Sequence, residues 1–306
     1  MDLKSKFLGA MLGSAIGDAI GELAFIYPEK ARLLSQIELV SELRYTDDTA
    51  MAIGVAESIK QEQGIDQHPL GNTFSRNFRR EPWRGYASGP PTIFSMVEAL
   101  GISYVEAARS LFGGGGSLGN GAAMRIAPVG LFFYAASDLY EQACASAEVT
   151  HAHAVGMDGA AVQASAVAQA VSLDPEIEFS TDTFIQELID FARTSEIKAK
   201  MTLLEALIKE EGAPSLAAHK IGRTVAVHES MPFAIYAFLQ HPKSFEECLF
   251  CAILNGGDRD TLGAMSCAIS GAYLGVEAIP ASWREKLENR AYIENLALAL
   301  AEKSPR

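Results

Sequence analysis

The sequence has few basic residues, few cysteines and no long apolar run, and each shortage excludes a class of protein. Lysine and arginine number 25 against 38 aspartates and glutamates, and the net charge of −13 argues against nucleic acid or an anionic membrane as the main partner. No uninterrupted apolar stretch approaches the roughly 20 residues of a membrane span. No Ala-x-Ala-like cleavage site follows the apolar residues 7–16, which argues against a signal peptide. We therefore expect a cytoplasmic protein that binds neither nucleic acid nor a membrane.

The four cysteines are too few for a disulfide framework in a chain of 306 residues. Cys248 and Cys251 have the C-x-x-C spacing, but they lie in an apolar segment with helical character. One helical turn apart, both thiols are expected to face a core, and Cys267 is a third buried candidate. A redox or zinc site at the C-x-x-C pair is the less favoured alternative.

Helical patterns dominate what is present, and two segments carry small residues at every fourth position. Glycine in a helix interior costs about 1 kcal/mol relative to alanine, so several in one helix need a compensating contact. Close approach of another backbone along the stripe is the simplest such contact. We expect both segments to be central helices of one all-α core that pack on each other. The first stripe is Gly9, Gly13, Gly17 and Gly21, and the second is Gly263, Cys267, Gly271 and Gly275.

The remaining periodicity also predicts helices, with no strand alternation of useful length, no repeat and no domain linker. One domain covering residues 1–306 is therefore expected. The run Gly113–Gly116 has the composition of a flexible linker. Because both flanks are hydrophobic and helical, a backbone cradle around a ligand is the alternative interpretation. The further helices are predicted at 49–61, 92–100, 103–111, 139–147, 155–172, 181–193, 200–210, 215–227, 231–240, 244–254 and 291–302.

Two acidic clusters, about 210 residues apart, each open a predicted helix. The first is Thr46-Asp47-Asp48-Thr49, and the second is Asp258-Arg259-Asp260-Thr261. A helix N-terminus favours one capping oxygen and tolerates acidic residues in its first turn, so capping explains part of each cluster. Four carboxylates that meet in space would need cations to neutralise them. Oxygen ligands without a nearby His or Cys favour Mg²⁺, with Mn²⁺ or Ca²⁺ possible.

Two weaker motifs could supply a ligand pocket. The glycine-rich stretch that ends in Ser117-Leu118-Gly119-Asn120-Gly121 could present backbone N–H groups to phosphates. His151 and His153 precede a predicted helix, where a histidine is most often a helix-start residue, and H-x-H without a third nitrogen ligand is a poor zinc site.

Taken together, five motifs resemble those of the ADP-ribosylglycohydrolases, and they occur in that family's order over nearly the whole chain. The similarity is greatest to the branch that removes serine-linked ADP-ribose and degrades poly(ADP-ribose) and O-acetyl-ADP-ribose. It implies one orthogonal helical bundle with two bound Mg²⁺ ions, or Mn²⁺ in their place. The motifs are Gly17-Asp18-Ala19-Ile20-Gly21, Tyr45-Thr46-Asp47-Asp48-Thr49, Gly119-Asn120-Gly121-Ala122-Ala123-Met124-Arg125, Thr150-His151 and Gly257-Asp258-Arg259-Asp260-Thr261.

The resemblance also implies roles for individual residues. Asp47 and Asp48 would take part in catalysis, with Glu22 as a candidate acid or base. The implied metal ligands are Thr46, Asp47, Asp48, Asp258, Asp260 and Thr261. The implied lining of the ADP-ribose cleft is Phe112, Gly116, Ser117, Gly119, Asn120, Gly121 and His151.

Three positions depart from the family's pattern. Where the resemblance implies an acidic residue seven positions after Asp18, this sequence has Phe25, and Glu22 or Glu29 could replace that acid. Arg259 stands where a small polar residue is usual, and Leu118 stands where the serine-directed branch tends to have an aromatic one.

We expect a Mg²⁺-dependent hydrolase that cleaves the bond between ADP-ribose and an acceptor, with serine-linked or other O-linked substrates favoured, including those on ADP-ribosylated proteins. One alternative is an enzyme for arginine or another acceptor. The other is a protein that binds ADP-ribose without turnover.

Overall fold

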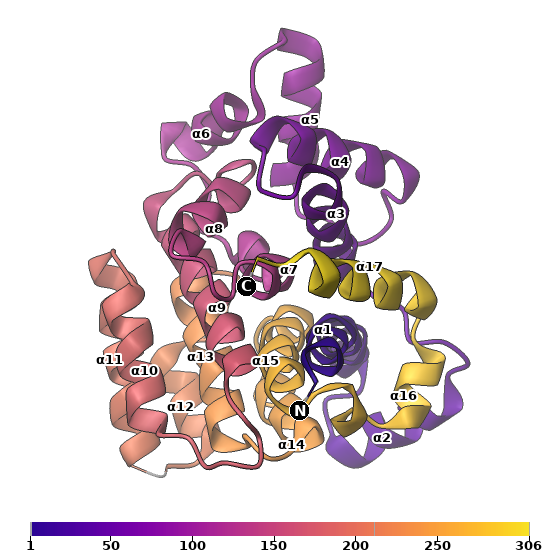
Figure 1. Ribbon diagram of the computed structural model, residues 1–306, viewed down its shortest axis with the longest axis vertical. Helices are drawn as coiled ribbons and strands as arrows, with labels where there is room; N and C mark the ends of the chain where they lie inside the picture. The colour runs from indigo at the N-terminus through magenta and orange to yellow at the C-terminus, as the bar shows by residue number, and fades with distance from the viewer. Residues whose placement is uncertain (1, 211, 306) are drawn as a thin grey trace.

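The two glycine stripes lie against each other at the centre of the computed structural model, which describes residues 2–210 and 212–305 (Figure 1). They belong to α1 (Leu3–Ile26) and α15 (Arg259–Leu274), with Gly275 directly after the last residue of α15. A Cβ atom at Gly17 would lie 2.1 Å from the carbonyl oxygen of Gly263, and one at Gly9 would lie 2.3 Å from that of Gly271. Any side chain at these positions would force the helices apart. The prediction that the two stripes form central helices packed on each other is confirmed.

The expected all-α architecture is also confirmed, since the described residues contain α-helices and two short 3₁₀ helices but no strand. The other α-helices are α2 (Lys30–Leu39), α3 (Asp47–Glu62), α4 (Gln67–Arg80), α5 (Gly89–Leu100), α6 (Tyr104–Gly114), α7 (Ala127–Phe132), α8 (Leu139–Glu148), α9 (Ala154–Ser172), α10 (Thr181–Phe191), α11 (Ser195–Lys209), α12 (Pro214–Ile221), α13 (Val227–Gln240), α14 (Phe245–Ile253), α16 (Ala281–Lys286) and α17 (Arg290–Lys303). The 3₁₀ helices are Asn120–Ala122 and Val276–Ala278.

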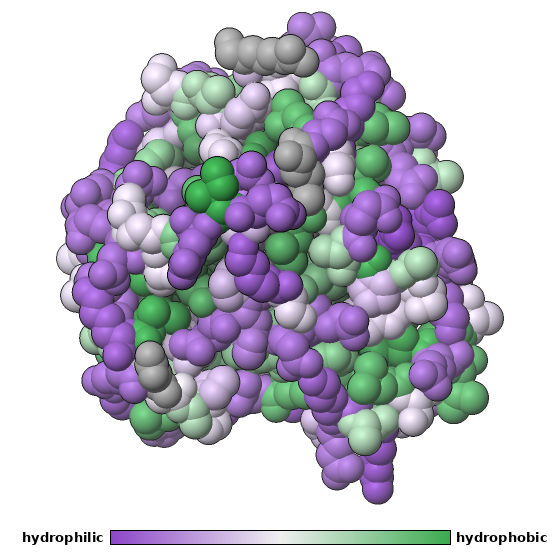
Figure 2. Space-filling model, turned by 60° about the horizontal axis from the view of Figure 1, so that its bottom comes forward, coloured by the Kyte–Doolittle hydropathy of each residue, from purple (hydrophilic) through white to green (hydrophobic). Residues whose placement is uncertain are grey.

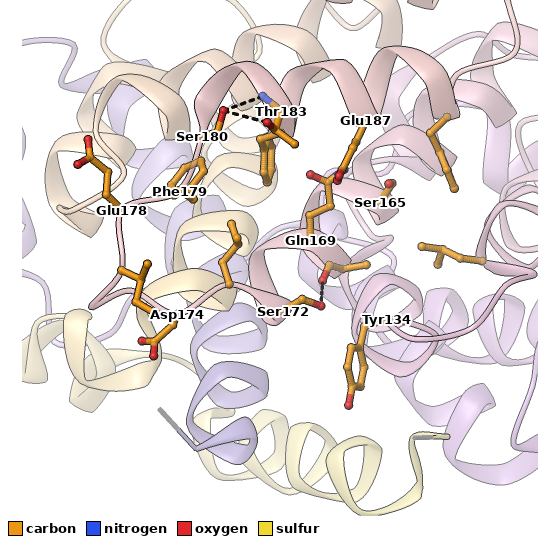
Figure 3. A pocket seen from close by; sticks show the side chains of 16 residues that line it. Tyr134, Ser165, Gln169, Ser172, Asp174, Glu178, Phe179, Ser180, Thr183 and Glu187 are labelled. Atoms are coloured by element: carbon orange, nitrogen blue, oxygen red, sulfur yellow. Dashed lines mark hydrogen bonds between the residues drawn. The ribbon is translucent and has the colours of Figure 1, made fainter.

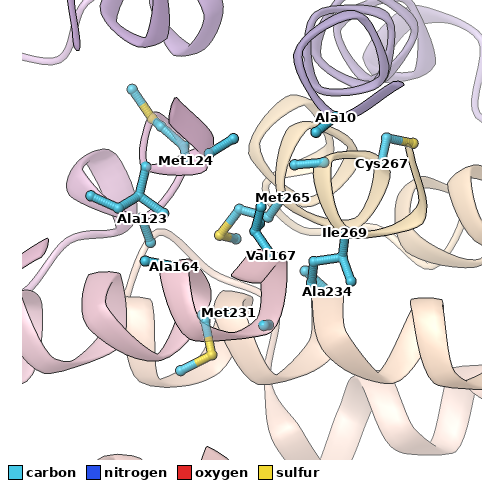
Figure 4. Packing of buried hydrophobic residues seen from close by; sticks show 14 of the residues in the cluster. Ala10, Ala123, Met124, Ala164, Val167, Met231, Ala234, Met265, Cys267 and Ile269 are labelled. Carbon is cyan, nitrogen blue, oxygen red and sulfur yellow. The ribbon is translucent and has the colours of Figure 1, made fainter. Parts of the chain in front are cut away.

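A single hydrophobic cluster surrounds the central pair and includes residues from Phe7 to Ala301. Helices α9, α13 and α14 pack on α15, and α17 packs on α1. Figure 4 shows Met265 and Ile269 of α15 next to Val167 of α9 and Ala234 of α13. Small side chains at the contacts let the helices approach closely, and the larger ones fill the remaining space.

The composition of α1 follows from this central position. It is the one helix among the described residues whose length and mean hydropathy would suffice to cross a membrane, although it contains no uninterrupted apolar run of that length. The share of its most apolar window that is buried inside the protein is 78%. Burial against α15 and α17 accounts for its apolar surface.

The outer surface is mixed. On the face in Figure 2, hydrophobic residues are spread over several small areas among hydrophilic ones.

The C-x-x-C cysteines lie in the core, as the favoured interpretation predicted. Cys248, Cys251 and Cys267 are buried, and all four cysteines are free thiols. Burial raises the pKa of Cys251 to about 12, which keeps its thiol protonated and unreactive.

Two predicted helices are clearly wrong in extent, since the helix predicted at 200–210 begins at Ser195 and the one predicted at 215–227 is interrupted. Residues 215–227 were expected to be a single helix, but α12 ends at Ile221 and α13 begins at Val227. Gly222 has φ +95°, and a Cβ atom there would lie 2.4 Å from the side-chain carboxyl carbon of Glu229. Only glycine fits this turn, and the apolar periodicity on both sides hides the break. The periodicity also failed to identify four helices, α2, α4, α7 and α16.

The glycine run at the end of α6 is an ordered turn. Regular helical geometry stops at Leu111, and Phe112, Gly113, Gly114 and Gly116 all have positive φ. A Cβ atom at Gly116 would lie 2.7 Å from the backbone nitrogen of His153. The turn therefore leads the chain closely past the start of α9.

Candidate active site

The structure brings the two acidic clusters together in one hollow of about 400 Å³, here called the carboxylate hollow. Asp47 and Asp48 come from the first turn of α3, while Asp258, Asp260 and Thr261 come from the start of α15. Both helices have their positive dipole ends at this point, which partly offsets the negative charge. Residues more than 200 positions apart thus form one group of oxygen atoms.

Helix α1 holds both helix starts in place. The carboxylate of Asp18 is fully buried and accepts hydrogen bonds from the backbone N–H groups of Thr46 and Thr49 at 3.0 and 3.1 Å. It also accepts one from the Thr49 hydroxyl at 2.6 Å. One turn further along α1, a Cβ atom at Gly21 would lie 2.5 Å from the Cα atom of Asp260. The glycine stripe that organises the core therefore also fixes the distance between the acidic clusters.

The carboxylates in this hollow resist ionisation. Burial, followed by repulsion from neighbouring carboxylates, raises the pKa of Asp47 to about 7 and that of Asp260 to about 8. The same causes raise the pKa of Asp48 well above its usual range. Asp48 Oδ2 and Asp260 Oδ1 are buried without a hydrogen-bond partner. Unpaired buried carboxylate oxygens are costly, so this group favours the binding of protons or cations.

These shifts predict how the stability of the protein depends on pH in the absence of divalent cations. A carboxyl whose pKa is raised on folding retains a proton that the unfolded chain has lost. The free energy of unfolding therefore falls as the pH rises towards and through the folded pKa. For Asp47 and Asp260 the folded values are about 7 and 8 against an ordinary 3.8. We expect a lower melting temperature at pH 8.5 than at pH 7 in EDTA, and a smaller difference in Asp260→Asn. A melting temperature that rises over this interval would contradict the assignment.

A second wall of the hollow comes from the turn that contains Asn120. The backbone N–H of Asn120 donates to the carbonyl of Val225 at 2.8 Å, and its side-chain Nδ2 donates to Asp258 Oδ2 at 2.7 Å. The Asp258 N–H donates in turn to the Arg223 carbonyl at 2.9 Å. The break at 222–226 is thus what connects this turn to the second acidic cluster.

His151 lies against the same turn. Its ring nitrogen Nδ1 is 2.7 Å from the hydroxyl of Thr150, and a Cβ atom at Gly121 would lie 2.7 Å from its Cε1 atom. Burial, with a further effect from the charge of Arg125, lowers the pKa of His151 to about 3. The imidazole is therefore neutral near pH 7 and can act as a hydrogen-bonding group for a ligand.

Most of the site residues expected from the sequence line the carboxylate hollow, but three do not. Gly116 is buried behind it, against the start of α9. Thr46 and Glu22 instead line a neighbouring space of about 360 Å³, here called the side hollow. Those that line the carboxylate hollow are Asp47, Asp48, Phe112, Ser117, Gly119, Asn120, Gly121, His151, Asp258, Asp260 and Thr261.

Sequence reasoning missed several residues of the site. Asp18 was noted only as part of a motif, although a lone aspartate inside an apolar helix is itself a sign of a buried polar role. The segment Ser88–Pro90 at the start of α5 and Val225 also line the hollow. A proline at the first turn of a helix signals a helix start but carries no sign of a ligand site.

A larger cavity, of about 770 Å³, lies elsewhere between α9, α10 and the segment that connects them. Figure 3 shows polar residues such as Gln169 and Glu187 around it, together with Phe179. It shares no lining residue with the carboxylate hollow. Size alone therefore does not locate the site in this protein, whereas the convergence of carboxylates does.

The profile of the ADP-ribosylglycohydrolase family matches residues 1–306. The chain belongs to this family. ADP-ribosylhydrolase ARH3 of Homo sapiens is 33% identical over 293 residues, which cover 86% of this chain and 80% of the human protein. ADP-ribosylhydrolase ARH3 of Xenopus tropicalis is 32% identical over 324 residues, which cover 93% and 91%. A solved structure titled "ADP-ribosylglycohydrolase-related protein complex" matches with a TM-score of 0.69, at 26% identity over 99% of both chains.

The family resemblance inferred from the motifs is thus confirmed, and the two relatives named above place the chain in the ARH3 branch of the family. As an ADP-ribosylglycohydrolase the protein is a hydrolase of glycosidic bonds that acts on substrates containing ADP-ribose. This argues against the alternative of a protein that binds ADP-ribose without turnover.

The structure also places the positions that depart from the family's pattern. Phe25 lies near the end of α1 with 48% of its surface exposed. Glu29 forms an exposed ion pair with Arg32 and lines neither hollow, so Glu22 is the better placed of the two candidate acids. The guanidinium of Arg259 donates to the carbonyl of Ile253. Leu118 is exposed, and its carbonyl accepts a hydrogen bond from the N–H of Val227 at 3.1 Å.

Proposed function

We propose that the protein is a Mg²⁺-dependent hydrolase that cleaves the bond between the distal ribose of ADP-ribose and an acceptor oxygen. The favoured substrates are serine-linked ADP-ribose, poly(ADP-ribose) and O-acetyl-ADP-ribose. The observation that carries the proposal is the pair of unpartnered buried oxygens, Asp48 Oδ2 and Asp260 Oδ1, in one hollow. Similarity to ADP-ribosylhydrolase ARH3 proteins supports the choice of substrate.

The donor set fits a hard divalent cation. The ligands we propose are carboxylate and hydroxyl oxygens, which Mg²⁺ prefers and Mn²⁺ accepts. Among residues 2–210 and 212–305, no three His, Cys, Asp or Glu side chains are already arranged as a metal site. The proposed binding of a cation therefore rests on the unpaired carboxylate oxygens and on the raised pKa values. When bound, the metal would supply Lewis acidity and lower the pKa of a water. The proposed ligands are Thr46, Asp47, Asp48, Asp258, Asp260 and Thr261.

Other residues that line the carboxylate hollow supply groups that suit the rest of ADP-ribose. Phe112 lies at the rim with 71% of its surface exposed and offers an aromatic face. Ser117 Oγ accepts the N–H of Gly119 at 3.1 Å, which leaves its own hydrogen able to donate to a phosphate oxygen. The neutral imidazole of His151 adds no charge beside the diphosphate. These groups would bind and orient the substrate so that its anomeric carbon lies at the carboxylates.

Hydrolysis breaks the bond between the anomeric carbon and the acceptor oxygen, and a water oxygen bonds to that carbon. The departing acceptor oxygen needs a proton, and the water must lose one. Glu22 lines the side hollow, and its charge contributes to the raised pKa of Asp260, so it lies at the edge of the reacting region. We propose Glu22 as the group that holds and transfers this proton.

Glu22→Gln tests this role. The amide keeps the size of the side chain but cannot exchange the proton, so kcat should fall at least about tenfold while KM changes little. Glu29→Gln is the matched control, because Glu29 is an exposed glutamate that lines neither hollow. Normal turnover in Glu22→Gln would leave Glu22 as a solvated charge near the helix end.

The acceptor is tested by incubating the purified protein with serine-linked and arginine-linked ADP-ribosyl peptides in Mg²⁺ and measuring released ADP-ribose. We expect release from the serine-linked peptide. Release from the arginine-linked peptide alone would favour the alternative acceptor and contradict the proposed substrate. Release from neither would contradict the proposal as a whole.

A further inference from the structure

The side hollow opens from the same carboxylates as the carboxylate hollow. The two spaces share Asp47, Gly85 and Asp260 as lining residues. Gly85 has φ +89°, and a Cβ atom there would lie 3.8 Å from Asp47 Oδ1, with no other atom within 4 Å. The backbone at the junction thus leaves open space next to the carboxylates, and two separate groups of a ligand can meet there.

The two spaces differ in the groups that line them. The side hollow is lined by Glu22 and Glu288 in addition to the shared aspartates, and by Arg44 and Arg84, whose guanidinium groups already pair with glutamates. The carboxylate hollow alone has the neutral His151 and the Ser117 turn among its lining residues, and these groups suit the diphosphate. If ADP-ribose occupies the carboxylate hollow with its anomeric carbon at the shared aspartates, the acceptor on that carbon extends into the adjoining side hollow.

An exposed tryptophan stands at the side hollow. Trp83 lies in the loop between α4 and α5, lines the side hollow and has 72% of its surface exposed. A large aromatic side chain that is not buried in the core is a typical anchor for a partner, since it offers contact area with few torsions to fix. Figure 1 shows α3, α4 and α5 gathered at one end of the molecule, where this loop connects α4 to α5.

The loop that carries Trp83 is held firmly by the next residue, Arg84. Its guanidinium donates to Glu288 at 2.7 and 2.9 Å, to Glu81 at 2.9 and 3.2 Å and to the carbonyl of Tyr45 at 3.0 Å. It also lies 4.1 Å from the centre of the Tyr45 ring. The Arg84 side chain is only 5% exposed, so these contacts are shielded from water. The backbone next to Trp83 is therefore anchored, which lowers the entropic cost of ordering this loop when a ligand binds.

We infer that the side hollow is the acceptor subsite, in which Trp83 packs against the polypeptide next to the modified residue of an ADP-ribosylated protein. This inference rests on the proposed hydrolysis of ADP-ribose from an acceptor. It assigns a polypeptide, rather than a small acceptor such as an acetyl group, as the substrate that this surface recognises. Trp83 acts in binding and takes no part in the chemical step.

Binding rather than turnover tests the inference. The ligands are free ADP-ribose and a serine-type ADP-ribosyl peptide whose linking oxygen is replaced by CH₂, so that it cannot be hydrolysed, and both are titrated calorimetrically in Mg²⁺. We expect the peptide analogue to bind about tenfold more tightly than ADP-ribose. Trp83→Ala should remove this difference without changing the affinity for ADP-ribose, and Trp83→Phe should restore much of it. Leu39→Ala, at a residue 77% exposed on α2, is the control for loss of exposed apolar surface.

Three outcomes would overturn the inference: equal affinity for the two ligands in the unmodified protein, equal weakening of both by Trp83→Ala, or binding of neither. The proposed function is tested separately, by measuring the release of ADP-ribose from the hydrolysable peptide. If that peptide releases no ADP-ribose while the binding difference and its dependence on Trp83 persist, the proposed catalysis fails and the subsite remains supported.

Discussion

Asp48→Asn should raise the melting temperature of the metal-free protein while lowering kcat at least about a hundredfold. Asp48 is buried among carboxylates that raise its pKa, and one of its oxygens has no hydrogen-bond partner. Asparagine is neutral without taking up a proton, so the substitution removes the cost of burying this ionisable group, and each kcal/mol gained corresponds to roughly 1.5–2 °C in a chain of 306 residues. The same substitution removes a proposed cation ligand, so the increase in melting temperature caused by Mg²⁺ should disappear.

Asp190→Asn is the matched control for this experiment. Asp190 is exposed on α10 and accepts a hydrogen bond from Gln186 at 2.9 Å, which an asparagine oxygen can also accept. It should leave the melting temperature, the Mg²⁺ effect and the activity unchanged. Full activity in Asp48→Asn would show that its carboxylate is not needed, and a fall in metal-free stability would show that the carboxylate is satisfied within the fold.

Gly263→Ala should destabilise the protein by about 3 kcal/mol, an effect of the size expected for an overpacked core. The new Cβ atom would lie 2.2 Å from the carbonyl oxygen of Gly17 and 2.8 Å from its carbonyl carbon. Backbone atoms cannot move aside as a flexible side chain can, so α1 and α15 must separate. Because Asp18 lies beside Gly17 and Asp260 lies near Gly263, we expect activity to fall even at temperatures at which the variant remains folded.

This effect is measured by comparing the free energies of unfolding in denaturant of Gly263→Ala and Gly64→Ala. Gly64 lies after α3 with an ordinary negative φ, and a Cβ atom there would meet nothing within 4 Å. The same substitution should therefore be neutral or slightly stabilising at Gly64. Equal stability of the two variants would contradict the close backbone contact between α1 and α15.

The helix pairing at the centre of the fold could be predicted from the sequence because it depends on a local feature with one simple cause. Glycine at every fourth position is costly in an isolated helix, and close helix contact is what makes it tolerable. By contrast, the break between α12 and α13 depends on Gly222, a single residue within a continuous apolar pattern. One glycine in a helical pattern has several explanations, so the sequence could not separate them.

The acidic clusters of the site were also visible, because two groups of adjacent aspartates exceed what helix capping requires. Their meeting in one hollow depends on the contacts that α1 makes with both helix starts. The role of Asp18 as the link to α3 could not be read from spacing, since its hydrogen bonds join residues about 30 positions apart. The side hollow depends on Arg84 and Glu288, more than 200 positions apart, so no local pattern could reveal it.

The most direct test of the central claim is release of ADP-ribose from a serine-linked ADP-ribosyl peptide by protein stripped of metal with EDTA, before and after Mg²⁺ is restored. We predict no release without metal, recovery of activity on addition of Mg²⁺ to the unmodified protein, and no recovery in Asp48→Asn. Equal release with and without Mg²⁺ would contradict the claim that the carboxylates of α3 and α15 act by holding a cation.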